Sequence, residues 1–138
     1  MICHHRESLF REMGQDESLI EAMREPFRQW LETKLADSSY FGFVFEDHGT
    51  VVAGVGLLEL DWAPHVLHPS MDRRGYVLNV YVEPTHRRRG LAQQLMRRSE
   101  EEFRTRGLQY AALHASEAGR PIYEGLGWSP TSEMGKAL

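Results

Sequence analysis

The sequence has a single cysteine among its 138 residues, Cys3, so an internal disulfide is excluded. A chain without disulfides fits a reducing compartment. No apolar run approaches the length that spans a bilayer, and residues 1–14 are too charged for a secretory signal. The chain also has no internal repeat and no linker. These absences indicate a cytoplasmic protein without a membrane partner, built as a single domain over residues 1–138.

The balance of charge excludes a further class of partner. The sequence has 16 Lys and Arg and 20 Asp and Glu residues, and its formal net charge is −4. Electrostatics of this sign argue against nucleic acid as a partner. The positive charge is nevertheless uneven, because residues 86–98 hold five arginines and no acid. We expect Arg97 and Arg98 to pair with acids four residues further on. The remaining arginines suggest a small anionic ligand.

Hydrophobic spacing and turn residues predict an alternation of helices and strands. The expected elements are helices over 2–13 and 16–36, strands over 40–45 and 51–60, a loop over 61–75, a strand over 76–82, a helix over 90–106, a strand over 108–115, a short helix over 121–125 and a final strand over 131–138. Pro26 predicts a kink or two shorter helices within 16–36. Alternation in 76–82 places Tyr76, Leu78, Val80 and Val82 on one face. The order indicates a mixed α/β sheet with a parallel crossover near the middle.

The strand at 76–82, the loop after it and the helix that begins at Gly90 form a candidate anion site. Free N–H groups and a partial positive charge gather at a helix N-terminus. Gly90 allows close approach to the backbone, and Ala92 leaves the first turn clear. The segment lacks the lysine of a P-loop and the three glycines of a dinucleotide fingerprint. By itself it predicts a phosphate or pyrophosphate site, or simply a basic helix start with a capping glycine.

Two motifs in order resemble the GNAT superfamily of acyl-CoA N-acyltransferases. Arg87-x-x-Gly90-x-Ala92 matches the pyrophosphate motif of that family, and 78–84 looks like its bulged strand ending in Glu-Pro. The stretch 113–128, which ends in Tyr123-x-x-Leu126-Gly127-Trp128, resembles its second cofactor motif. The resemblance covers residues 40–130 well and the N-terminal helices only in pattern. The family usually opens with a strand that this sequence lacks, so either the start codon is misassigned or one edge strand is missing.

The resemblance implies a twisted mixed β-sheet with helices on both faces, splayed between the strands near 76–82 and 108–115. It also implies acetyl-CoA as co-substrate, without a metal. Backbone groups of 80–82 would bind the pantetheine arm, and amides of 88–93 the pyrophosphate. The cofactor residues implied are Val80, Tyr81, Val82, Arg87, Arg88, Arg89, Gly90, Leu91, Ala92, Gln93, Ser116 and Gly119. Ser116 stands where many members carry an asparagine, and its hydroxyl keeps a donor and an acceptor.

Acyl transfer to an amine needs an acid for the leaving thiolate and a base for the amine. Tyr123 matches the usual general acid of the family, and the alternative is a packing tyrosine. Some members carry a glutamate on the strand 108–115, but Ala111 and Ala112 stand there in this chain. Glu59, near the end of a central strand, is the base candidate, although it could simply face solvent.

Other residues remain open for the role of base. These are Asp61, His65, His68 and Glu83, acting directly or through water. His65 and His68 resemble a metal pair only superficially, and surface histidines are the better interpretation because no third ligand supports them. Asn79 interrupts an apolar strand, where it orients a substrate or water, or is a satisfied buried amide.

We therefore predict an N-acetyltransferase that moves an acetyl group from acetyl-CoA to a primary amine by direct attack in a ternary complex. The acceptor is a small-molecule or peptide amine, and the choice among antibiotics, amino acids, small amines and protein N-termini stays open. Dimerisation is common among similar proteins, so a homodimer is compatible with the resemblance. The alternatives are a non-catalytic sensor of CoA or a nucleotide, and an interaction protein whose arginines dock an acidic partner.

Overall fold

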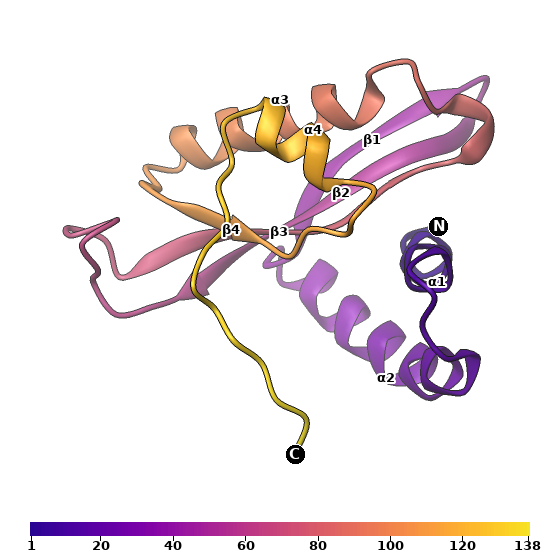
Figure 1. Cartoon of the computed structure of the whole chain (residues 1–138), viewed down its shortest axis with the longest axis horizontal. Coiled ribbons are helices and arrows are strands. Elements are labelled where there is room, and N and C mark those ends of the chain that lie inside the picture. The colour runs from indigo at the N-terminus through magenta and orange to yellow at the C-terminus, as the bar shows by residue number, and fades with distance from the viewer.

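Nine elements follow one another in the computed structural model, which describes residues 1–138 (Figure 1). They are α1 (Ile2–Glu12), α2 (Glu17–Ala36), β1 (Phe41–Asp47), β2 (Thr50–Asp61), β3 (Arg73–Val82), the 3-10 turn η1 (Pro84–His86), α3 (Leu91–Thr105), β4 (Ala111–Leu113) and α4 (Arg120–Gly125). None of the helices combines the length and the apolar character that a membrane span requires.

The four strands form one mixed sheet in the order β1-β2-β3-β4. β1, β2 and β3 pair antiparallel, whereas β4 pairs parallel to β3 after the crossover through α3. Figure 1 shows α3 and α4 on one side of the sheet and α1 and α2 on the other. The predicted fold class, a mixed α/β sheet with helices on both faces, is confirmed.

Each face of the sheet has its own apolar core. The larger core lies under α3 and contains Ala53, Val55, Leu57, Val77, Leu95, Met96, Phe103 and Leu108. The smaller core lies against α2 and contains Phe27, Leu31 and Tyr40. Full burial of a large apolar side chain stabilises a fold by about 1.5–3 kcal/mol. The predicted inner stripe of α3 is confirmed, because four of its members are buried, including Ser99, whose hydroxyl donates to the Leu95 carbonyl at 2.8 Å.

A β-bulge at Asn79 interrupts β3. Leu78 lies opposite Gly56 and Tyr81 opposite Gly54, so β3 holds one extra residue between these pairs. Asn79 takes the left-handed conformation (φ 56°), which asparagine tolerates better than most residues. Its side chain is buried and fully engaged: Oδ1 accepts from Arg6 Nη1 at 2.8 Å, and Nδ2 donates to the Tyr40 hydroxyl at 3.1 Å. Asn79 is therefore a satisfied buried amide.

The bulge reverses the alternation of β3, so the prediction that one face carries Tyr76, Leu78, Val80 and Val82 is wrong. An extra residue moves every later side chain to the opposite face. Leu78 packs with the smaller core on the side of α2, whereas Val80 and Val82 pack with the larger core on the side of α3.

Two further expectations differ from the structure. α2 is one helix that runs through Pro26. Pro26 removes the hydrogen bond to the Ala22 carbonyl, but both residues are exposed, so water can replace it. The final strand over 131–138 is absent, because residues 129–138 make no backbone hydrogen bond and β4 is only three residues long.

Replacing Gly56 by alanine should destabilise the protein. A Cβ at this position would lie 2.0 Å from the Tyr40 hydroxyl, which is the group that receives Asn79 Nδ2. We expect G56A to lower the free energy of unfolding by about 1–3 kcal/mol in urea denaturation. The matched control is G125A, because a Cβ on Gly125 meets nothing within 4 Å. Equal stability of the two variants would contradict the packing described.

Candidate active site

β3 and β4 part within the sheet and leave an open edge. Their pairing runs from Gly75–Ala111 to Val77–Leu113 and then stops, whereas β3 continues to Val82. β3 therefore has no strand on its β4 side after Val77. We call the space between the diverging strands the splay; its position agrees with the predicted one.

The bulge decides which backbone groups face the splay. Before it, the amide of Gly75 donates towards β4, to the Tyr110 carbonyl at 2.9 Å. After it, the amide of Glu83 donates to the Val52 carbonyl of β2 at 2.8 Å. Because backbone groups alternate in direction along a strand, Val80 and Val82 turn theirs away from β2. Their N–H groups point into the splay, as the predicted cofactor role of both residues requires.

A row of free amides lies at the start of α3. None of the six backbone N–H groups from Arg88 to Gln93 donates a hydrogen bond within the protein. Arg88 (φ 63°) and Gly90 (φ 74°) are both left-handed, and alternation of this kind makes a concave nest of N–H groups. Nothing lies within 4 Å of a Cβ built on Gly90, so the approach is open. We call residues 88–93 the amide cradle; with the helix dipole, it is suited to an anion.

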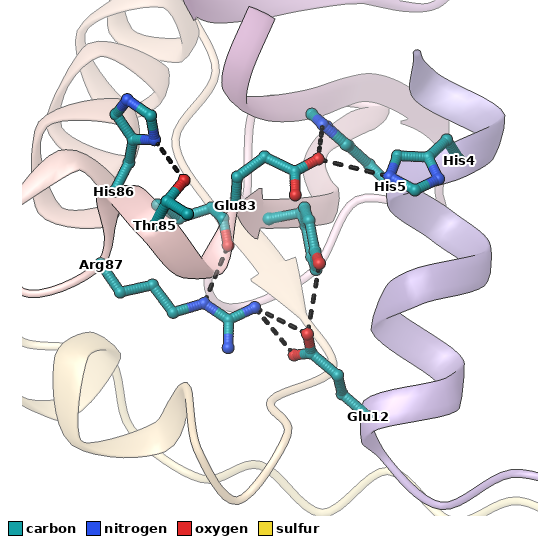
Figure 2. A network of polar contacts seen from close by, with 9 residues as sticks. His4, His5, Glu12, Glu83, Thr85, His86 and Arg87 are labelled. Atoms are coloured by element: carbon teal, nitrogen blue, oxygen red, sulfur yellow. Dashed lines mark hydrogen bonds and ion pairs between the residues drawn. The ribbon is translucent and has the colours of Figure 1, made fainter.

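The side chain of Arg87 points away from the cradle and connects the loop before α3 to α1. Its Nε donates to the Val82 carbonyl at 2.8 Å, and its Nη2 donates to the Glu12 carboxylate at 2.7 and 3.0 Å (Figure 2). Tyr81 joins the same carboxylate, donating its hydroxyl at 3.2 Å. The pair with Glu12 raises the pKa of Arg87. Tyr81 therefore faces α1 by its side chain and β2 by its backbone, and lies away from the splay.

Glu83 lies in the same network and touches two histidines of α1. Its Oε1 is 3.3 Å from His4 Nε2 and 3.4 Å from His5 Nε2 (Figure 2). Burial lowers the pKa of His5, and the charge of Glu83 opposes that shift. Glu83, one of the open base candidates, thus connects α1 to the end of β3.

Tyr123 lies on α4 with its ring against Gly119. A Cβ on Gly119 would come within 2.9 Å of the Tyr123 ring, so glycine is needed for this contact. Ser116 shapes the turn before it, because its hydroxyl accepts from the Gly119 amide at 3.1 Å. Burial raises the pKa of Tyr123, and no protein group hydrogen-bonds its hydroxyl. A protonated, unengaged phenol of this kind is a competent proton donor.

A cavity of about 930 Å³ lies beside Tyr123, against β4. It is lined by β4, α4, the second half of α3 and the extended C-terminal residues. None of the cradle residues lines it, so this cavity is distinct from the anion site.

Glu59 lies in ion pairs at the far end of the sheet. Its carboxylate contacts Arg73 and, at 3.2 Å, Nη1 of Arg106. Arg106 is the C-cap of α3, and the cradle is at the N-terminus of the same helix. The base role of Glu59 stays a prediction, and the structure does not bring this residue together with the splay.

The two loop histidines are not both on the surface. His68 is fully buried, and the prediction that it is a surface residue is wrong. Its Nδ1 donates to the Met71 carbonyl at 3.0 Å, and Nε2 accepts from Arg74 at 3.0 Å. No spacing in the sequence reveals these contacts. No cluster of three His, Cys, Asp or Glu side chains suits a metal ion.

Three polar side chains meet at the splay in a way that the sequence did not predict. His114 directly follows β4 and contacts the Tyr76 hydroxyl through Nδ1 and Glu133 Oε2 through Nε2, the latter at 2.9 Å. The sequence signal was weak because His114 fell inside a strand expected over 108–115. Only the end of pairing at Leu113 brings it to the opening.

Comparisons with known proteins agree with this arrangement. A family model, the acetyltransferase (GNAT) domain, matches residues 6–131. The GCN5-related N-acetyltransferase from Ralstonia eutropha JMP134 is 53% identical, with a TM-score of 0.98 over 99% of this chain and 90% of that one. A comparison with curated protein sequences gives no match.

Two more distant structures show the same fold. A predicted acetyltransferase with acetyl-CoA from Clostridium acetobutylicum is 24% identical, with a TM-score of 0.89 over 99% of this chain and 87% of that one. The aminoglycoside antibiotic 6'-N-acetyltransferase from Acinetobacter haemolyticus is 19% identical, with a TM-score of 0.67 over 83% and 80%. On the family model and the Ralstonia structure, this chain belongs to the GNAT family of acetyltransferases.

Proposed function

We propose that this protein transfers an acetyl group from acetyl-CoA to a primary amine of a small molecule or peptide, by direct attack in a ternary complex. The observation that carries the proposal is the amide cradle, six free N–H groups that open beside the unpaired edge of β3. Acetyl-CoA, the molecule that accompanies the Clostridium acetyltransferase in its crystal structure, has a pyrophosphate for the cradle and an amide-bearing arm for the strand edge.

The cradle would bind the pyrophosphate through its backbone. The N–H groups of Gly90, Leu91, Ala92 and Gln93 point out of the first turn of α3, where the helix dipole adds partial positive charge. Arg88 and Arg89 form no ion pair within the protein, so their charges are available to tune binding. Hydrogen bonds to a charged group are worth about 1.5–3 kcal/mol each.

The splay would bind the pantetheine arm and the thioester. The N–H groups of Val80 and Val82 replace a missing strand, and one of them polarises the thioester carbonyl. The neutral amine attacks the carbonyl carbon, the C–N bond forms and the C–S bond breaks. Tyr123 donates its proton to the departing thiolate, and Ser116 and Gly119 hold the turn that positions α4.

The direct experiment is an acceptor screen. Purified protein is mixed with acetyl-CoA and a panel of amines, antibiotics, amino acids and peptides, and thiol release is measured. The proposal expects release that depends on at least one acceptor. Tight binding of acetyl-CoA without thiol release on the whole panel would favour a non-catalytic sensor. That alternative stays open because Ala111 and Ala112 leave β4 without a carboxylate.

Replacing Tyr123 by phenylalanine should reduce turnover and spare binding. The change removes the proton donor but keeps the ring that packs on Gly119. We expect kcat to fall by about 10²–10⁴-fold, with the affinity for acetyl-CoA within a factor of two by calorimetry. Since burial raises the pKa of Tyr123, loss of this acid should affect the wild-type rate only above the ordinary tyrosine value of about 10. Unchanged kcat in Y123F would assign Tyr123 a packing role only.

Replacing Gly90 by valine should abolish cofactor binding. The side chain would enter open space above the cradle, and a β-branched residue is strained at φ 74°. We expect the affinity for acetyl-CoA to fall by at least about 100-fold, the equivalent of one or two charged hydrogen bonds.

The control for G90V is G107V, at the other end of α3. Gly107 is also left-handed (φ 78°) and also faces open space, so backbone strain is matched. Equal affinity in G90V and G107V would contradict the cradle. Retained binding of an acidic partner by G90V, without binding of acetyl-CoA by the wild type, would instead support an interaction protein.

A further inference from the structure

Three polar side chains form a chain of contacts at the point where β3 and β4 part. The Tyr76 hydroxyl contacts Nδ1 of His114, and Nε2 of His114 lies 2.9 Å from Oε2 of Glu133. They come from β3, from the residue after β4 and from the extended C-terminal residues. We call Tyr76, His114 and Glu133 the splay triad.

Hydrogen-bonding capacity sets the direction of this chain. An ionised carboxylate only accepts, so Nε2 of His114 carries the proton that Glu133 receives. Nδ1 of the neutral imidazole is then an acceptor, and the Tyr76 hydroxyl donates to it. The order hydroxyl, imidazole, carboxylate is the one found where a histidine base accepts a proton from a hydroxyl and a carboxylate orients the histidine.

The triad lies on the acceptor side of the splay. Val77 points into the core under α3, so its neighbours Tyr76 and Leu78 point to the opposite face, towards α1 and α2. The cradle begins α3 on the first face. An acceptor that meets the thioester from the second face would encounter the Tyr76 hydroxyl at the entrance. His114 itself has 66% of its side chain exposed, which gives a proton an exit to solvent.

We propose that the splay triad is the proton acceptor for the attacking amine, with the Tyr76 oxygen as the contact to the amine, His114 as the base and Glu133 as a positioning residue. This inference rests on the proposed amine acetylation. It places a base at the splay, to which the structure brings neither Glu59 nor a carboxylate of β4.

The protons balance over the reaction. The ammonium form of the acceptor gives one proton to the Tyr76 oxygen as the Tyr76 hydroxyl proton passes to Nδ1 of His114, and that proton leaves from His114 to solvent. The neutral nitrogen then forms the C–N bond. The acceptor nitrogen loses its second proton as the C–S bond breaks. This proton returns to Tyr123 and replaces the proton that Tyr123 gives to the thiolate. One proton is released for each acetyl group transferred.

The charges around the triad fit a relay. The charge of Arg6 on α1 acts on Tyr76, and Arg6 donates to Asn79 but forms no ion pair, with its buried Nε unpartnered. Glu133, from the C-terminal residues, adds the only negative charge in contact with His114. Burial raises the pKa of Tyr76, with Glu133 adding to the shift and Arg6 opposing it. Tyr76 therefore stays protonated at rest, and its hydroxyl passes a proton on as it receives one.

The test is His114→Gln, compared with His48→Gln. Glutamine can keep both contacts of the triad but cannot act as a base. His48 lies in the β1–β2 turn with 97% of its side chain exposed, so H48Q controls for loss of a histidine. Acetyl-CoA affinity and far-ultraviolet circular dichroism establish that each variant is folded.

The expected result is a pH-dependent defect. At neutral pH, H114Q should lose about 10²–10⁴-fold in kcat/KM for an alkylamine acceptor. The defect should shrink as the pH approaches the amine pKa of about 10.4, because the amine then ionises without help. An arylamine, which is already neutral, should be acetylated by H114Q at nearly the wild-type rate.

Two further variants test the individual members. Y76F breaks the relay and should reproduce the pH-dependent loss of H114Q. E133Q weakens the contact that orients His114 and should lower kcat/KM for an alkylamine more than for an arylamine, a difference that a purely structural contact would not produce.

Each outcome separates this inference from the proposed function. Wild-type turnover with H114Q within twofold of H48Q at neutral pH overturns the triad and leaves acetyl transfer standing. An equal loss of rate at every pH and with every acceptor also overturns it, because the contact then only orders the C-terminal residues. Absence of wild-type turnover on any amine overturns the proposed function and the triad together.

Discussion

The bulge at Asn79 is the constraint on which the rest of the site depends. One extra residue in β3 ends the pairing with β4, turns the amides of Val80 and Val82 into the splay and returns their side chains to the core under α3. A left-handed asparagine is costly unless its surroundings fix it. Arg6 and Tyr40 provide that fixation by satisfying both ends of its amide, and Gly56 leaves the space that Tyr40 needs.

Local chemistry made part of this site predictable from the sequence. The roles proposed for Gly90 and Ala92 at a helix start, and for Tyr123 in its motif, depend on a few neighbouring residues. The bulge was implied only by resemblance, and its effect on alternation was missed, since an extra residue leaves no mark on hydrophobic spacing. The burial of His68 and the meeting of His114 with Tyr76 depend on contacts between distant segments. The prediction of a strand over residues 131–138 was wrong because strand propensity does not by itself supply a partner strand.

The arginine-rich segment illustrates a division between side chain and backbone. Three consecutive arginines, 87–89, suggest three charges for one anion. The structure instead uses Arg87 as a brace between Val82 and Glu12, while Arg88 contributes a left-handed backbone to the nest. Composition drew attention to this segment, but the geometry suited to an anion comes from backbone amides, and amides are present in every sequence.

Helix α1 reaches the site by two kinds of contact that respond differently to salt. Arg6 meets Asn79 in a part-buried hydrogen bond, whereas Glu12 meets Arg87 in an ion pair with both side chains about two-fifths exposed. Mobile ions screen exposed charges over about 8 Å at physiological ionic strength and leave buried bonds largely unaffected. Rising salt should therefore loosen α1 from its C-terminal end, releasing the brace on the cradle while the bulge stays fixed. Ionic strength would then act on the cradle separately from the geometry of the splay.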